Sequence, residues 1–238
     1  MTVELPTEIG RHDGLAYSLW LPGPDRPAGG GVVVLHGAGS AKENHHDFAR
    51  AAVGSGLGAL AFDQRGHGDS DGPMDGRALD DVVAMAELLC SRLGASPGAD
   101  APIALRGSSM GGYLALVSAQ AARAAAVVAI CPASAEGLSR GLTEGRFTFA
   151  AEAGALQGFL AAHDERAAVA GLQAPVLLLH AEGDEQVPVE HSRELATLTR
   201  SAHSRLIAVP GGHHRSVQHD PDLQAVSLRF LTRELAAA

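Results

Sequence analysis

The sequence predicts one α/β domain with a mostly parallel central sheet of about eight strands and helices on both of its faces. Three observations support this class. Short apolar runs rich in β-branched residues alternate with longer segments of helical periodicity, as in successive β-α-β units. Polar, glycine-rich loops follow several of the runs, at the edge where such sheets place their ligands. The 238 residues, 46% of them hydrophobic, are enough to bury one large core.

The composition limits the partners that the protein is expected to have. Its formal net charge of −9 argues against nucleic acid or an anionic membrane as the main partner. No Pro/Gly/Ser-rich linker or block of charge divides residues 1–238. Met1–Pro6 lacks the basic and apolar regions of a signal peptide, and no apolar run is long enough to cross a bilayer. We therefore expect one cytoplasmic domain, of open oligomeric state, that acts on a small molecule.

The first half of the chain supplies three strands and two helices to this architecture. Leu15–Leu21 alternates apolar with small or polar residues, which predicts an antiparallel opening strand. Val32–Leu35 and Leu57–Phe62 lack such alternation and are typical of strands covered on both faces. Asn44–Val53 and Arg77–Leu93 have helical periodicity, so we expect helices that cover the sheet.

The second half continues the alternation. Strands are predicted at Ala126–Cys131, Val176–His180 and Leu206–Val209, and helices at Met110–Arg123 and Gln218–Leu235. Right-handed crossovers between parallel strands bring the loops that follow them to one edge of the sheet. Candidate functional residues are therefore sought in those loops.

The alternation lapses in residues 135–170, after the sixth predicted strand. This segment contains several glycines and three of the six phenylalanines, Phe147, Phe149 and Phe159. We expect a small, mostly helical cap over the carboxyl edge of the sheet. Its aromatic side chains either fix the cap to the core or line a substrate pocket, and Phe147 and Phe149 are the candidates for binding substrate.

A sharp turn between a short strand and a helix carries the candidate nucleophile. Gly107-Ser108-Ser109-Met110-Gly111 matches the G-x-S-x-G pattern, in which the serine is held at strained φ/ψ angles. The strain leaves no room for larger residues two positions before and after the serine, and Gly107 and Gly111 meet that demand. Ser109 is therefore expected to present its hydroxyl at the edge of the sheet.

The loop His36-Gly37-Ala38-Gly39-Ser40 follows the third predicted strand. Acyl transfer needs two backbone N–H groups that stabilise a developing oxyanion. Met110, directly after the candidate nucleophile, and Ala38 are the expected donors. His36 either orders this loop or ionises, and His45 and His46 either face substrate or lie at a solvated helix start. We retain His36 and His45 as candidate substrate contacts.

A second polar loop, residues 63–72, contains several glycines. A phosphate-binding loop would lead into a helix N-terminus with a nearby lysine or ribose-binding acid, but this loop continues into Pro73. Nucleotide binding is therefore not expected. Asp63, Arg65 and Ser70 are expected to fix the loop through hydrogen bonds.

Two later loops supply a candidate acid and base. Asp184 lies in a turn after a buried strand, where a carboxylate can orient an imidazole, and Glu182 and Glu185 are its competitors. His214 is favoured over His213 as the general base because Gly211 and Gly212 can form the turn before it.

Metal and cofactor sites are not expected. His219 could join the two histidines at 213 and 214 in a zinc site, but no cysteine or acid nearby completes the ligands. Cys90 and Cys131 lie in apolar surroundings and are predicted to be buried free thiols.

The order serine, acid, histidine along the chain resembles that of the α/β-hydrolase superfamily. More narrowly, the sequence resembles small serine hydrolases such as carboxylesterases, monoacylglycerol lipases and proline iminopeptidase-like enzymes. The matching motifs are His36-Gly37, the Asp-x-Arg-Gly-x-Gly-x-Ser run of residues 63–70, residues 107–112, Gly183-Asp184 with Val187-Pro188, and residues 211–214.

The resemblance implies a two-step acyl transfer with Ser109 as nucleophile, His214 as base and Asp184 as its orienting acid. Ester hydrolysis of a small to medium acyl substrate is the expected reaction. Amide or peptide cleavage is the nearest alternative, and a ligand receptor with slow or no turnover is another.

Overall fold

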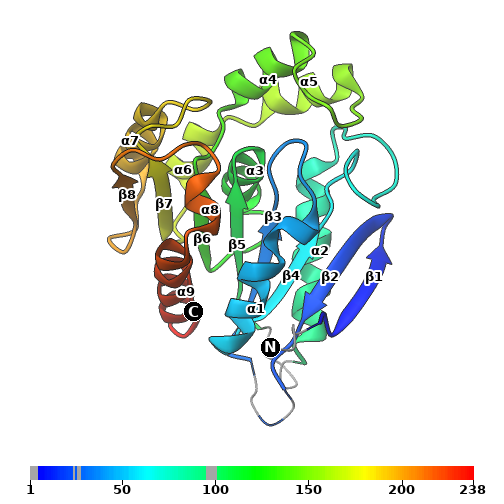
Figure 1. The fold of residues 1–238 in the computed structure, drawn as a ribbon, viewed down its shortest axis with the longest axis vertical. Helices are drawn as coiled ribbons and strands as arrows, with labels where there is room; N and C mark the ends of the chain where they lie inside the picture. The colour runs from blue at the N-terminus through cyan, green and yellow to red at the C-terminus, as the bar shows by residue number, and fades with distance from the viewer. Residues whose placement is uncertain (1–4, 24, 26–27, 95–100) are drawn as a thin grey trace.

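A computed structural model describes residues 5–23, 25, 28–94 and 101–238 of the chain. Their strands form one sheet in the order β1-β2-β4-β3-β5-β6-β7-β8 (Figure 1). Strands β3 to β8 pair in parallel, whereas β2 pairs antiparallel with both β1 and β4. The bounds are β1 Glu8–His12, β2 Leu15–Trp20, β3 Gly31–Leu35, β4 Gly58–Phe62, β5 Ile103–Ser108, β6 Ala126–Ile130, β7 Val176–Ala181 and β8 Arg205–Val209.

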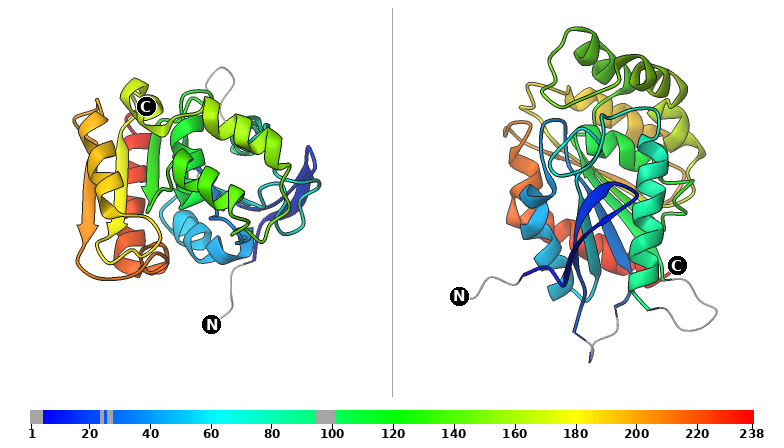
Figure 2. Two further views of the ribbon diagram at one scale, coloured as in Figure 1. Left: turned by 90° about the horizontal axis from the view of Figure 1, so that it is seen from above. Right: turned by 90° about the vertical axis from the view of Figure 1, so that its right-hand side faces the viewer.

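Helices cover both faces of the sheet, which confirms the predicted fold class. Helices α2 and α3 pack on one face and α1 and α9 on the other (Figure 2). The helices are η1 Lys42–His45, α1 His46–Gly54, α2 Ala78–Arg92, α3 Met110–Ser118, α4 Ala135–Thr143, α5 Ala153–Ala162, α6 Glu165–Gly171, α7 Val189–Leu198, α8 Ser216–His219 and α9 Pro221–Leu235. None of those in the described ranges is long and apolar enough to span a membrane.

The structure adds two elements that the sequence patterns did not predict. Strand β1 is an edge strand whose residues alternate between half-buried and exposed, with few apolar side chains to mark it. Helix α7 follows the loop that contains Asp184 and packs against β7 and β8. The expectation about a leader segment concerns Met1–Pro6, of which residues 1–4 lie outside the described part of the chain.

The predicted closing helix is divided into α8 and α9. Pro221 is the first residue of α9, where its missing N–H costs no helical hydrogen bond. The Asp220 carboxylate caps the new helix by accepting from the N–H groups of Asp222 and Leu223, both at 3.0 Å. Helix α3 is also shorter than predicted, since it ends at Ser118.

The segment for which a cap is expected contains three short helices. Helices α4 and α5 lie over the carboxyl edge of the sheet (Figure 1). Helix α6 instead packs against α3 and α7, beside the body of the domain. The part of residues 135–170 that covers the sheet edge therefore consists of α4, α5 and the connection between them, which makes one isolated β-bridge from Ala151 to Met74.

Candidate active site

Ser109 occupies a strained turn between β5 and α3. Its backbone has φ +54° and ψ −119°, a region that non-glycine residues rarely adopt. A Cβ on Gly107 would lie 1.9 Å from the carbonyl oxygen of Gly111, and a Cβ on Gly111 would lie 2.3 Å from that of Leu35. Only glycine fits either position, so these two residues allow the turn that exposes the serine.

The Asp184 carboxylate and the His214 ring form a hydrogen-bonded pair at the same sheet edge. His214 Nδ1 lies 2.7 Å from Asp184 Oδ2, and both side chains are nearly inaccessible to solvent. Because a carboxylate can only accept, Nδ1 carries the hydrogen and Nε2 keeps its lone pair. The other carboxylate oxygen accepts from the backbone N–H groups of Gln186, at 2.8 Å, and Val187, at 2.9 Å.

These contacts also set the charge of Asp184. Burial opposes ionisation of this carboxyl, but hydrogen bonds from His180 and His214 hold its pKa far below the ordinary value. The carboxylate is therefore charged at neutral pH and able to stabilise a protonated His214 ring.

The competing candidates lie elsewhere. Glu182 is exposed and pairs with Arg193 at 2.8 Å. The Glu185 carboxylate accepts from the backbone N–H of His214 at 3.2 Å, not from its ring. His213 is exposed at the surface of the loop. Of the candidate acids and bases, the geometry brings together Asp184 and His214.

The histidines considered for a zinc site do not gather around one point in the described part of the chain. His219 Nδ1 lies 3.1 Å from the Asp47 carboxylate, and its ring stacks on that of His45. The potential ligand atoms that do lie within 4.8 Å of one another belong to Cys131, Asp184 and His214. Two of these residues form the hydrogen-bonded acid–histidine pair, and both cysteines of the chain are free thiols.

The expected oxyanion donors lie beside Ser109. A Cβ on Gly37 would be 3.2 Å from the Cβ of Ser109, so the loop after β3 passes directly against the nucleophile. Met110 is the first residue of α3, where backbone N–H groups lack helical acceptors. Neither the Met110 nor the Ala38 N–H donates to an acceptor among the described residues. Both groups are therefore available to a ligand.

His36 is fully buried and lies at the start of the loop of residues 36–40. It was expected to order this loop and was kept as a candidate substrate contact. Its Nδ1 donates to the Gly37 carbonyl at 2.8 Å, and its Nε2 accepts from the Gln64 N–H at 3.0 Å. Burial lowers the pKa of His36 to about 4, so the ring is neutral. It orders the loop and leaves no ring nitrogen for substrate, which corrects its assignment as a substrate contact.

His45 is also buried, with 1% of its surface exposed. Its ring stacks on His219 with centroids 6.1 Å apart, and burial lowers its pKa well below the ordinary value. The His46 ring packs edge-on against Trp20 at 4.5 Å. His45 is therefore neither solvated at a helix start nor in contact with substrate, which corrects both predictions for it. Helix α8 and the neighbouring strands β3 and β4 pack against the element that carries it.

Two cavities meet at Ser109. The larger, of about 790 Å³, extends between α4 and α7, and the smaller, of about 260 Å³, is lined by His214. Phe147 lines both cavities. Phe149 lies behind it, stacked on its ring at 5.2 Å, in an apolar hollow shared with Met110 and Phe159. Of the two candidate aromatic contacts, Phe147 is therefore the one that faces the open space.

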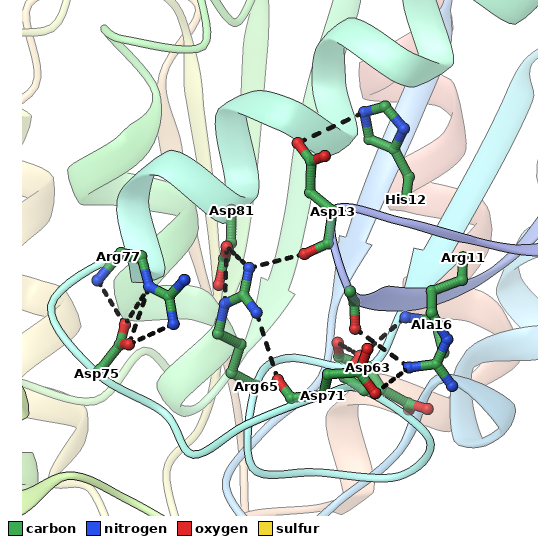
Figure 3. Close-up of polar contacts among 12 residues, drawn as sticks. Arg11, His12, Asp13, Ala16, Asp63, Arg65, Asp71, Asp75, Arg77 and Asp81 are labelled. Carbon is green, nitrogen blue, oxygen red and sulfur yellow. Dashed lines mark hydrogen bonds and ion pairs between the residues drawn. The ribbon is translucent and has the colours of Figure 1, made fainter.

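The loop of residues 63–72 is fixed by buried charge pairs. The Arg65 guanidinium donates to the Asp81 carboxylate at 3.0 and 3.1 Å and to the Asp13 carbonyl at 2.9 Å (Figure 3). Asp63 is fully buried and accepts from Lys42 Nζ at 2.7 Å. The Ser70 hydroxyl donates to the Asp63 carbonyl at 2.5 Å. The Lys42–Asp63 pair holds this loop against helix η1, which follows the loop of residues 36–40.

Comparison with known proteins identifies the family. Residues 26–147 match the family described as serine aminopeptidase, S33, over half of the chain. The chain belongs to this α/β-hydrolase family. An uncharacterised protein of Mycobacterium tuberculosis is 30% identical over 227 residues, which cover 90% of this chain and 72% of the relative. As a member of the S33 family, the chain is a hydrolase on the α/β-hydrolase fold.

Solved structures share the fold of this S33 hydrolase. A monoacylglycerol lipase of Paleococcus ferrophilus is 21% identical with a TM-score of 0.69, over 94% of this chain and 98% of the lipase. Est1E of Butyrivibrio proteoclasticus, in a structure with bound ferulic acid, is 19% identical with a TM-score of 0.68, over 98% of this chain and 100% of Est1E.

The sequence patterns missed His180, which lies within the apolar run of β7. His180 is fully buried, and its Nε2 lies 2.9 Å from the Val187 carbonyl and 3.4 Å from Asp184 Oδ2. Because a carbonyl only accepts, Nε2 carries the hydrogen, and Nδ1 then accepts from the Ser192 hydroxyl at 2.7 Å. His180 thus orients the turn that presents Asp184. A histidine inside an apolar strand, four residues before the candidate acid, is the signal that could have found it.

Proposed function

We propose that this S33-family hydrolase cleaves esters of small to medium acyl groups through a Ser109-His214-Asp184 triad. The observation that carries the proposal is the 2.7 Å pair between His214 and Asp184, which opens onto the cavity that also contains Ser109. A nucleophile at a strained turn, an imidazole with a free Nε2 and a buried carboxylate are the parts that acyl transfer requires.

The proposed reaction proceeds in two steps. His214 Nε2 takes the Ser109 hydroxyl proton as the oxygen attacks the carbonyl carbon, and Asp184 stabilises the imidazolium. The Ala38 and Met110 N–H groups stabilise the oxyanion. Breakdown of this intermediate leaves an acyl-serine, and His214 gives its proton to the departing alcohol. Water attacks the acyl-serine by the same route and releases the acid.

The cavities divide the expected substrate into two parts. The leaving group must lie beside His214, which protonates it, and the cavity there is lined by polar residues such as Asn44 and Gln218. The acyl group then extends along Phe147 into the larger cavity at Ser109, which is also lined by Leu138. Phe147→Ala and Phe149→Ala should change the preference among p-nitrophenyl esters of graded acyl length. An unchanged preference would remove both residues from the acyl site.

Peptide cleavage is the second candidate. The matching family carries the description serine aminopeptidase. An aminopeptidase must also hold a free α-amino group, and Glu185 and Glu190 line the larger cavity as possible partners for that cation. Comparing an alanine p-nitroanilide with p-nitrophenyl acetate distinguishes the two substrates. Faster cleavage of the anilide would favour the aminopeptidase.

A fluorophosphonate probe and p-nitrophenyl acetate test the proposed nucleophile directly. The wild-type protein should be labelled and should hydrolyse the ester, and Ser109→Ala should abolish both. Ser108→Ala is the matched control, because this neighbouring serine is buried and its hydroxyl has no partner among the described residues. Labelling without turnover would favour a slow receptor. If circular dichroism shows that the protein is folded and it is neither labelled nor active on the ester, the proposed triad is refuted.

A further inference from the structure

Two histidines hold successive peptide units of the loop that presents Ala38. The Gly37 carbonyl and the Ala38 N–H belong to one trans peptide, so they point in opposite directions. His36 Nδ1 binds that carbonyl at 2.8 Å and thereby turns the Ala38 N–H away from the core. The next peptide ends in the Gly39 N–H, which donates to His67 Nε2 at 3.1 Å. The two rings touch edge-on, with centroids 4.8 Å apart.

The tautomer of His67 is fixed by its own contacts. Its Nδ1 lies 3.0 Å from the Arg65 carbonyl, which can only accept, so Nδ1 carries the hydrogen. Nε2 therefore keeps the lone pair that receives the Gly39 N–H. The ring is 5% exposed, and burial lowers its pKa, so it remains a neutral acceptor.

The cap segment packs directly on this histidine. The Phe149 ring stacks on the His67 ring with centroids 4.3 Å apart and planes 27° apart. Phe147 stacks on Phe149 in turn and reaches both cavities at Ser109. Gly39 is also close to the cap, since a Cβ on it would lie 3.1 Å from Thr148 Oγ1.

Backbone hydrogen bonds fasten the same cap segment to the loop that carries His67. The Ala150 N–H donates to the Gly66 carbonyl at 3.2 Å, and the Met74 N–H donates to the Ala150 carbonyl at 2.9 Å. The Glu152 N–H then donates to the Met74 carbonyl at 2.8 Å. A Cβ on Gly66 would lie 2.0 Å from the Ala150 carbonyl oxygen, so the two segments approach as closely as glycine permits.

We propose that His67 is a positioning residue that couples the cap to the oxyanion loop. His67 fixes the peptide next to Ala38 through the Gly39 N–H, and Phe149 holds the His67 ring in place. The orientation of the Ala38 N–H therefore depends on a cap residue that lies behind the open cavities. The inference rests on the proposed serine mechanism, in which Ala38 stabilises the oxyanion.

Two substitutions of His67 separate its hydrogen bond from its ring. His67→Phe keeps the stack on Phe149 but cannot accept the Gly39 N–H, so kcat for p-nitrophenyl acetate should fall at least about 10-fold while KM changes less than about 3-fold. Complete loss of an oxyanion donor costs about 10² to 10³ in rate, and a misplaced donor should cost less. His67→Gln can place an amide oxygen near the position of Nε2 and should retain kcat within about 3-fold of wild type.

Phe149→Leu tests the coupling without touching the hydrogen bond, and it should lower kcat about 3-fold or more. His12→Phe on the exposed edge strand β1 is the matched control and should leave kcat unchanged. Phenylboronic acid, which forms a tetrahedral adduct with serine hydrolases, should bind His67→Phe less tightly by about the factor lost in kcat/KM. If His67 contributed only to stability, His67→Phe would lower the unfolding temperature and leave the affinity for phenylboronic acid unchanged.

Amide hydrogen exchange provides a readout that does not depend on catalysis. The Gly39 amide should exchange faster in His67→Phe and in Phe149→Leu than in wild type and His12→Phe. Unchanged exchange at Gly39, or wild-type kcat and boronate affinity in folded His67→Phe, would overturn the proposal. If His67→Phe fails to fold, Phe149→Leu decides by the same measurements. If the wild type has no esterase activity, the proposed function fails, and the exchange experiment still tests the coupling.

Discussion

Asp184→Asn tests the acid of the proposed triad with the smallest change of shape. The asparagine oxygen can still accept the backbone N–H groups of Gln186 and Val187, which lie 2.8 and 2.9 Å from the wild-type carboxylate oxygen. The amide nitrogen then faces His214 Nδ1 across the 2.7 Å contact. Because two donors cannot pair, the ring must move its hydrogen to Nε2. That nitrogen can no longer accept the proton of Ser109.

The expected loss is large. In a serine triad, an imidazole held in the wrong tautomer lowers kcat by about 10⁴-fold. At about 1.4 kcal/mol for each factor of ten, this corresponds to about 5.5 kcal/mol of lost transition-state stabilisation. The fold should persist, because the isosteric side chain keeps two of its buried hydrogen bonds.

The assay is kcat for p-nitrophenyl acetate at neutral pH, with folding checked by circular dichroism. Glu182→Gln is the matched control, since Glu182 is exposed and pairs only with Arg193 among the described residues. It should stay within about 2-fold of wild type. Glu185→Gln keeps an amide oxygen for the His214 backbone N–H and should also remain active. Loss of activity in Glu185→Gln, with near-wild-type activity in Asp184→Asn, would refute the assignment of the acid.

Four further predictions follow from packing and burial. Gly107→Ala should prevent folding or lower the free energy of unfolding by about 3 kcal/mol or more, because its Cβ would lie 1.9 Å from a carbonyl oxygen of α3. In Gly154→Ala in α5, the added Cβ would have no atom within 4 Å, so the change should be neutral or stabilising by up to about 1 kcal/mol. Urea titration measures the free energy of unfolding of both variants. Burial lowers the pKa of His36 from an ordinary 6.5 to about 4. As the pH falls, the His36 ring is therefore protonated in the unfolded chain before it is protonated in the folded protein. The free energy of unfolding should be highest above pH 6.5 and should lose about 3 kcal/mol from this group by pH 4; a flat urea profile across that range would contradict the prediction. Burial raises the pKa of the Cys131 thiol to about 12, so a disulfide reagent should modify it only after denaturation and the half-buried Cys90 sooner, and rapid modification of both native thiols would contradict this.

The sheet was predictable because its signals are local. Strands β3, β4 and β6 are covered on both faces and therefore consist of continuous apolar runs. Strand β1 could not be found in the same way, since its half-exposed edge position demands no regular apolar pattern. Helix α7 follows the turn that contains Asp184, and the amphipathic pattern typical of such a helix is present in its sequence.

The environment of each histidine was not predictable from local patterns. His45 is buried because α8, from near the other end of the chain, packs over it. His67 was missed because its partner Gly39 belongs to a loop that only the folded sheet brings beside it. His180 was missed because it lies inside an apolar strand, although Asp184 is only four residues further along the chain. The role of a histidine ring nitrogen cannot be predicted until the group that donates to it or accepts from it is known.

The sequence alone specifies the strand, turn and helix around Ser109, because the steric demand of that turn requires Gly107 and Gly111 at fixed positions. It also determined the order of serine, acid and histidine along the chain. The tertiary structure decided which acid meets which histidine, since that choice depends on the distance between separate loops. It likewise decided that His36 supports a backbone peptide instead of facing a ligand, because burial and hydrogen bonding are properties of the packed molecule.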